Sequence, residues 1–101
     1  MVKHIVMWRL KEQAEGADQA TNARLVKAAL EGLRGRIPGL LAIEVGINID
    51  RSSAAFDVVL YSEFESAQAL AAYQVHPDHE NAAALIGRVR TERVLVDYQA
   101  D

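Results

Sequence analysis

Two of the three histidines fall in one short segment, Ala72–Glu80, together with a tyrosine. Tyr73 lies near the end of one predicted helix and His79 in the first turn of the next, both on faces predicted to point inward. An imidazole exchanges a proton near neutral pH, and a tyrosine hydroxyl can hold or polarise an oxygen of a bound molecule. The third histidine, His4, shares a predicted strand face with apolar residues. If that face meets the helices, the three polar groups converge on one apolar pocket.

Each of these side chains also has a structural explanation. His79 can be a helix histidine packed under the sheet and bonded to backbone, and Tyr73 can be an amphipathic core residue with its hydroxyl at the rim. His4 can simply begin a strand and hydrogen-bond a neighbour. Our candidate catalytic residues are His79, Tyr73 and His4, and our candidate ligand contacts are Trp8, Val6, Ile86 and His76. Because His76 precedes a proline, it suits a turn better than catalysis.

A metal site at His76, His79 and Glu80 is disfavoured by the spacing. Two imidazoles three residues apart lie one turn apart only within a single helix, and Pro77 interrupts that helix. Acidic side chains such as Glu63 are available, but no known ligand spacing is met. We therefore expect no metal.

Other chemistries lack their sequence patterns. The chain has no cysteine, which excludes a disulfide scaffold, thiolate metal sites and cysteine nucleophiles. The glycines form no phosphate-binding pattern after a strand, and Ser52-Ser53 has no neighbouring arrangement that would make a nucleophile. The arginines near residues 34–36 and 88–93 are separated by acids, and we interpret them as solvated surface. A net charge of -3 gives no general attraction to nucleic acid or to an anionic membrane.

Hydrophobic periodicity predicts the elements that must position these residues. Asp18 and Ser66 are suitable helix N-caps, Gly35 suits a left-handed helix stop, and Pro77 suits the first turn of a new helix. We expect strands over residues 3–10, 40–49, 55–64 and 92–99, and helices over about 18–34, 66–74 and from 77 onward. The strand over 40–49 alternates, and its predicted apolar face comprises Leu41, Ile43, Val45, Ile47 and Ile49.

The order β-α-β-β-α-β, with the second helical region split, predicts an α+β ferredoxin-like fold with a four-stranded antiparallel sheet. The 101 residues suit one domain, 1–101, with one core. No apolar run is long enough to span a membrane, and the first residues lead straight into a strand without a signal-peptide layout. We therefore expect a cytoplasmic protein.

The predicted sheet is apolar on both faces, whereas the helices can cover only one of them. A large exposed apolar sheet is unusual in a monomer, so the simplest cover is the same face of a second copy. We therefore expect a homodimer. The residues that cannot all lie under the helices are Trp8, Val6, Met7, Val59, Tyr61 and Leu95.

Several segments resemble the stress-responsive A/B barrel (Dabb) domain family. The opening Val2–Lys11 is similar to the first strand of that family, and the Tyr73–His79 segment, with its Tyr-x-x-His-Pro-x-His pattern, is the most specific match. Ile37-Pro38-Gly39 before a strand with Glu44-Val45-Gly46, Phe64-Glu65-Ser66 followed by Leu70, and the closing Val94–Tyr98 also resemble it. The resemblance covers essentially the whole chain, and it implies a ferredoxin-like protomer that pairs as a dimeric α/β barrel.

What the resemblance implies about activity is less specific, because most members have no established reaction. Plant polyketide cyclases of the family use a tyrosine and a histidine at positions matching Tyr73 and His79, with a strand-one histidine matching His4. By this resemblance the pocket would bind a polyketide-like or other carbonyl compound. His79 would be the general base, Tyr73 would position the carbonyl oxygen, and His4 would support the hydrogen bonds, with no organic cofactor. The alternatives are a non-catalytic stress or ligand-binding homodimer and, by fold analogy, a haem-degrading or cofactor-free monooxygenase.

Overall fold

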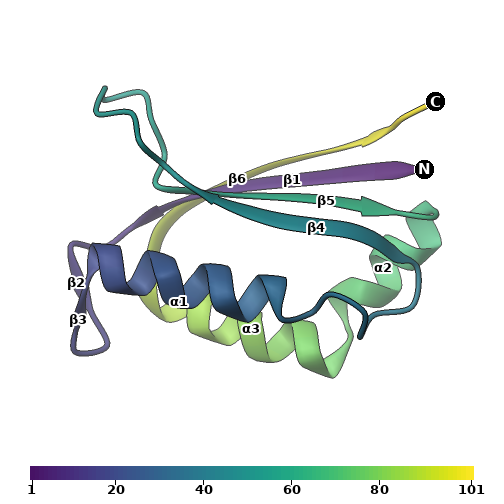
Figure 1. Ribbon diagram of the computed structural model, residues 1–101, viewed down its shortest axis with the longest axis horizontal. Helices are drawn as coiled ribbons and strands as arrows, with labels where there is room; N and C mark the ends of the chain where they lie inside the picture. Colours follow the sequence, from purple (N-terminus) through teal and green to yellow (C-terminus); the bar gives the residue numbers. More distant parts are fainter.

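The computed structural model describes all residues, 1–101, and contains one four-stranded sheet, one small hairpin and three helices (Figure 1). The elements, in chain order, are β1 (Val2–Leu10), β2 (Gln13–Ala14), β3 (Ala17–Asp18), α1 (Gln19–Glu31), β4 (Leu40–Ile47), β5 (Val58–Phe64), α2 (Ala67–Gln74), α3 (Pro77–Val89) and β6 (Arg90–Gln99). The short β2–β3 hairpin lies between the strand expected over residues 3–10 and the helix expected from about residue 18.

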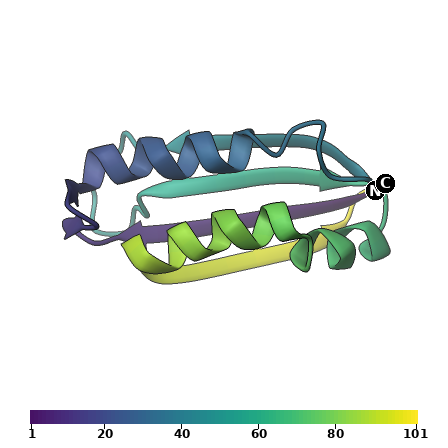
Figure 2. The ribbon, with the colours of Figure 1, turned by 90° about the horizontal axis from the view of Figure 1, so that it is seen from below.

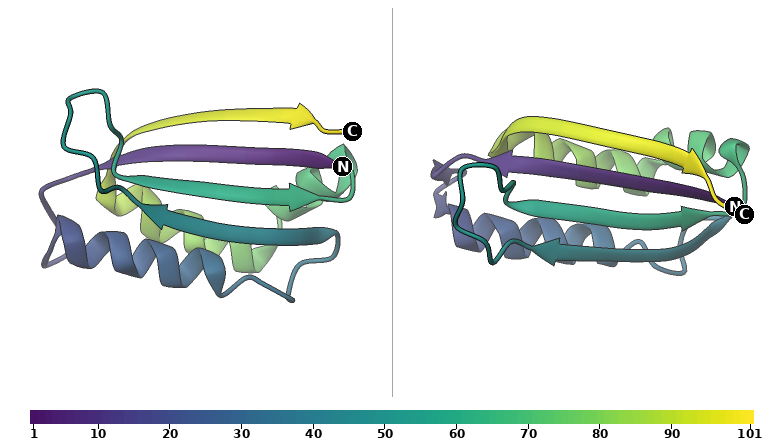
Figure 3. Two further views of the ribbon diagram at one scale, coloured as in Figure 1. Left: turned by 45° about the horizontal axis from the view of Figure 1, so that its top comes forward. Right: turned by 90° about the horizontal axis from the view of Figure 1, so that it is seen from above.

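The sheet has the strand order β4-β5-β1-β6, and every neighbouring pair is antiparallel. Figure 2 shows all three helices on one face of this sheet, with α1 and α3 side by side. In the views of Figure 3 the other face carries no helix. The ferredoxin-like α+β architecture is therefore confirmed. None of the helices combines the length and the apolar character that crossing a membrane requires.

The helix boundaries follow from local capping. The Asp18 carboxylate accepts from the Thr21 backbone N–H at 2.9 Å, and the Ser66 hydroxyl accepts from the Ala69 N–H at 3.1 Å, as their positions predicted. α1 ends at Glu31, three residues before the predicted end, and a run of turns leads to Gly35 at φ +78°.

Alternation along β1 decides which sheet face meets the helices. Its residues at even positions, from Val2 to Leu10, are buried, whereas Ile5 and Met7 face away from the helices and are more exposed. The buried face of β1 packs over apolar residues of α1, α2 and α3. The core that results contains 19 apolar side chains, with Phe64 and Tyr73 among its largest.

The predicted apolar face of residues 40–49 is only partly correct. Ile43 and Val45 are buried, but Leu41 and Ile47 are about half-exposed and Ile49 is 96% exposed. The pairing of β4 with β5 shifts register between Leu40 and Ala42, which breaks the simple alternation at Leu41. The strand ends at Ile47, so Ile49 lies in the loop beyond it.

The uncovered sheet face carries several apolar side chains, as expected from a set of residues that cannot all lie under the helices. Val6 and Trp8 lie under the helices, and Leu95 pairs directly with Val6 and so points to the helix side. The six residues that cannot all lie under the helices are thus divided, with Leu95 on the helix side and Met7, Val59 and Tyr61 on the other. The open sheet face, as we call it below, includes Ile5, Met7, Val59, Tyr61, Val94, Val96 and Tyr98.

Candidate functional site

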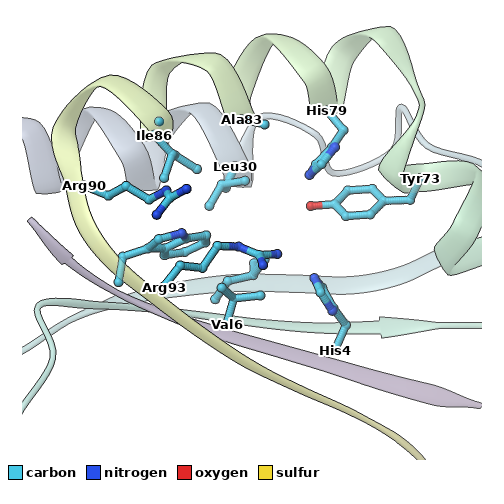
Figure 4. A pocket seen from close by; sticks show the side chains of 12 residues that line it. His4, Val6, Leu30, Tyr73, His79, Ala83, Ile86, Arg90 and Arg93 are labelled. Atoms are coloured by element: carbon cyan, nitrogen blue, oxygen red, sulfur yellow. The ribbon is translucent and has the colours of Figure 1, made fainter.

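A half-open cavity of about 290 Å³ lies between α3 and the part of the sheet formed by β1 and β6 (Figure 4). Apolar side chains form much of its wall, and six side chains capable of hydrogen bonding also line it. The lining residues are His4, Val6, Trp8, Leu30, Leu60, Tyr73, His79, Ala83, Ile86, Gly87, Arg90 and Arg93. The structure thus brings His4, Tyr73 and His79 to one cavity, together with Val6, Trp8 and Ile86.

Tyr73, on the last turn of α2, is fully buried, and its hydroxyl has no hydrogen-bond partner. Its ring packs against Phe64, with centroids 4.9 Å apart, and against His79 at 4.3 Å. Burial raises the pKa of Tyr73 to about 12, and the positive charge of Arg93 opposes part of that rise. The side chain therefore stays a neutral phenol that needs an acceptor, and its hydroxyl is directed towards the cavity (Figure 4).

His79 lies in the first turn of α3, where Pro77 starts the helix and turns the chain back after α2. Its Nδ1 lies 3.2 Å from the Gln74 carbonyl oxygen. A carbonyl can only accept, so Nδ1 donates, and in the neutral ring the Nε2 lone pair remains free. Burial lowers the pKa of His79 below its ordinary value, and the bond to Gln74 opposes this while nearby His4 and Arg93 add to it. His79 is therefore a neutral imidazole at pH 7, with one nitrogen able to take a proton.

His4 is buried on the central strand β1 and pairs directly across the sheet with Asp97 of β6. Its Nδ1 and the Asp97 carboxylate form a hydrogen bond, in which the carboxylate accepts. The Ser62 hydroxyl donates to the His4 backbone carbonyl at 2.8 Å and so helps to hold this part of the strand. His4 stands edge-on to Tyr73, with ring centroids 6.2 Å apart. The strand pairing therefore fixes the orientation of this imidazole at the cavity wall.

Two arginines of the group that we interpreted as solvated surface also line the cavity, although Arg93 is exposed and Arg90 is only partly buried. Arg93 lies directly across the sheet from Trp8, and this register points both side chains to the helix side. Arg90 is the residue at which α3 ends and β6 begins. Neither guanidinium forms an ion pair. The cavity therefore has a positively charged part besides its apolar wall.

His76 does not line the cavity, although the sequence suggested it as a ligand contact. Its Nδ1 accepts from the Asp78 backbone N–H at 3.1 Å, which makes it the N-cap of α3. Its position before Pro77 explains this, because the residue preceding a proline is held in an extended conformation suited to an N-cap. No group of three or more His, Asp or Glu side chains is arranged to hold a metal ion.

Asp97 and Arg93 are the site residues that sequence reasoning did not single out. Both come from β6, and both enter the site through its antiparallel pairing with β1. The feature of the sequence that could have identified them is the two-residue period of a strand. Positions 93, 95 and 97 share one face, and they pair with Trp8, Val6 and His4 of β1. Taken together, the site offers a free imidazole nitrogen, an unpartnered hydroxyl, a buried imidazole oriented by a carboxylate, and two cations.

Comparison with known proteins finds similarity to one protein family over nearly the whole chain. A family model described as the stress responsive A/B barrel domain matches residues 2–100. An uncharacterized protein of Streptomyces coelicolor is 31% identical over 99 residues, which cover 98% of this chain and 99% of that protein.

Solved structures agree with this fold. A dimeric protein of unknown function with a ferredoxin-like fold, from Bacteroides fragilis, is 30% identical with a TM-score of 0.87, covering 98% of this chain and 95% of that chain. A hydroxynitrile lyase from Passiflora edulis has a TM-score of 0.82 at 19% identity, covering 99% and 93% of the two chains, and shares the fold.

Proposed function

Because this chain belongs to the stress-responsive A/B barrel domain family, we propose that its cavity binds a small, largely apolar carbonyl compound and moves a proton on it. The reaction we propose is a cyclase-like or lyase-like carbon–carbon bond chemistry that starts from an enolate. The Passiflora hydroxynitrile lyase, an enzyme of the same fold, supports this at the level of the fold.

The observation that carries the proposal is the pairing of Tyr73 with His79 at one end of the cavity. Their rings lie 4.3 Å apart, the hydroxyl lacks a partner, and the imidazole keeps a free Nε2. Unpartnered buried hydroxyls are uncommon, because leaving one unsatisfied costs about 1–3 kcal/mol. A carbonyl oxygen of a bound molecule would supply the missing acceptor.

In the proposed reaction, Nε2 of His79 removes a proton from the carbon next to the carbonyl. The C–H electron pair moves into the new C=C bond, and the carbonyl oxygen becomes an enolate oxygen bonded by the Tyr73 hydroxyl. The enolate carbon then attacks a second carbonyl carbon of the same molecule, and the oxygen formed there receives the proton from His79. His4, oriented by Asp97, supports the hydrogen bonds at this wall.

Deuterium exchange tests the first step without the natural substrate. The probe is benzylacetone, a small aromatic ketone, in D₂O, followed by proton NMR. We expect the protein to accelerate loss of the α-proton signals, and His79→Ala to reduce that acceleration roughly 10²–10⁴-fold. The matched control is His76→Asn, which removes the other imidazole of the segment but keeps a side chain that can cap α3.

Exchange at the same rate with the wild-type protein and with His79→Ala would refute the proton-transfer function. The alternative is a non-catalytic, ligand-binding homodimer. The open sheet face favours a dimer in either case, since Met7, Val94 and Val96 are each 40–52% exposed there. The Bacteroides relative is dimeric, which supports the same assembly for this chain. We therefore propose a homodimer formed through the open sheet face.

A further inference from the structure

The two side chains with a permanent charge that line the cavity are both cations, and the Asp97 carboxylate beside His4 is not among the lining residues. Its 12 lining residues include Arg90 and Arg93 but no aspartate or glutamate. Three of the nine other Lys and Arg side chains form ion pairs, Arg9 with Glu92, Lys27 with Glu31, and Arg88 with Glu15, and the other six form none. The whole chain has a net charge of -3, so a cavity with two unpaired guanidinium groups runs against the overall charge.

The two arginines and the proton-transfer pair occupy different parts of the cavity. Figure 4 shows Arg90 towards one end and Tyr73 and His79 at the other, with Arg93 reaching into the space between. The positive charge of Arg93 acts on both members of the pair: burial raises the pKa of Tyr73 and Arg93 opposes that rise, whereas burial lowers the pKa of His79 and Arg93 adds to that lowering. Apolar side chains form the wall between the two ends, as Leu30 and Ile86 illustrate.

We propose that the cavity recognises a small oxo acid: a carboxylate held by Arg93 and Arg90, an apolar body, and a carbonyl group at Tyr73 and His79. This assignment rests on the proposed function, since it places the reacting carbonyl at the same pair. A guanidinium fork matches the two oxygens of a carboxylate, and such charge-assisted bonds are the stronger kind in proteins. The apolar wall and the volume of about 290 Å³ suit a compact acid rather than a large polar molecule.

Two isosteric probes separate charge from shape: hydrocinnamate and its uncharged amide, hydrocinnamamide. Titration calorimetry at millimolar concentration should show the carboxylate binding about 10- to 100-fold more tightly than the amide, which is what bonds to a charged group contribute. Arg93→Gln should remove most of that preference and Arg90→Gln part of it. Arg88→Gln is the matched control, because it removes the same charge two residues from Arg90 but from a side chain outside the cavity.

A second readout is the titration of His79, followed by NMR. The carboxylate would cancel part of the Arg93 charge, so hydrocinnamate should give a higher His79 pKa than hydrocinnamamide does. This difference should vanish in Arg93→Gln, a change that a merely structural role for Arg93 would not produce.

Equal affinity for the two probes, or no detectable binding of either, would overturn the oxo-acid assignment. So would a preference for the carboxylate that Arg88→Gln reduces as much as Arg93→Gln. The benzylacetone experiment is independent, because that ketone has no charge. If the protein exchanges protons of benzylacetone but does not prefer the carboxylate probe, only the oxo-acid assignment is refuted. If it prefers the carboxylate probe but does not exchange protons, the anion site is supported and the proton-transfer function is refuted.

Discussion

Replacing Tyr73 with phenylalanine should make the protein more stable while impairing its cavity. The hydroxyl is buried and unpartnered, and such a group costs about 1–3 kcal/mol. Phenylalanine removes it and keeps the ring contacts with Phe64 and His79. For a domain of this size, each kcal/mol moves the melting temperature by about 4–8 °C. We therefore expect Tyr73→Phe to melt at least about 4 °C higher than the wild type, and to bind or turn over carbonyl compounds less well.

The measurement is thermal unfolding by circular dichroism at one protein concentration, since dimerisation makes melting temperatures depend on concentration. Ser62→Ala is the control, because the Ser62 hydroxyl is also buried on the helix side but donates to the His4 backbone carbonyl, and its loss should lower stability by roughly 0.5–1.5 kcal/mol. If Tyr73→Phe melts lower, by as much as the control does, the hydroxyl has a protein partner and our argument from its isolation fails. Higher stability with reduced binding would be typical of a functional site, where stability and activity oppose each other.

Three further predictions concern assembly, pH and the chain turn before β4. Val59→Asp places a charge on the open sheet face and should dissociate the dimer, as measured by sedimentation velocity at micromolar concentration. Leu95→Asp places the same charge on the helix side and should leave the dimer intact. Identical behaviour of the two variants would contradict the proposed interface. Because the pKa of His79 is lowered in the folded protein, the unfolded chain binds its proton first as pH falls. The difference in melting temperature between the wild type and His79→Ala should therefore be constant above about pH 6.5, and the wild type should lose stability relative to the variant as the pH drops further. A difference that does not change with pH would count against a buried neutral imidazole. Gly39→Ala should destabilise the protein by more than about 1 kcal/mol in urea unfolding, because φ is +81° and a Cβ would lie 2.6 Å from a side chain of α2. Gly35 has a similar φ but open space around it, so Gly35→Ala should lower the free energy of unfolding by less. Equal losses in the two variants would show that the backbone conformation, and not the contact with α2, causes the destabilisation.

Features fixed by neighbouring residues could be predicted from the sequence. The N-caps Asp18 and Ser66 and the break before Pro77 depend on one turn of backbone, and each lies where its residue type indicated. The two faces of β1 could also be separated, because side chains alternate along a strand, but both faces are largely apolar and the sequence did not decide which one meets the helices.

Features set by distant pairing could not be predicted in the same way. The register shift near Leu41 depends on how β4 meets β5, and the side on which Leu95 lies depends on how β6 meets β1. The same limit applied to the site. The types of Tyr73 and His79 pointed to proton chemistry, but the carboxylate beside His4 and the cation beside Trp8 arise only once β6 is placed against β1.

The position of β1 in the sheet constrains how the chain can fold while it is being made. β1 is the first strand in the sequence, yet both of its sheet neighbours, β5 and β6, come from the second half of the chain. At about 5–20 residues per second, ribosomal synthesis leaves β1 without a partner for several seconds. During that time α1 can form locally, but an apolar strand must stay unpaired. Because His4 and Asp97 are 93 residues apart in sequence, the cavity wall is completed only when the last strand joins the sheet. We expect a nascent chain halted before β6 to be prone to aggregation and to bind chaperones, and ligand binding to arise only after the final strand has docked.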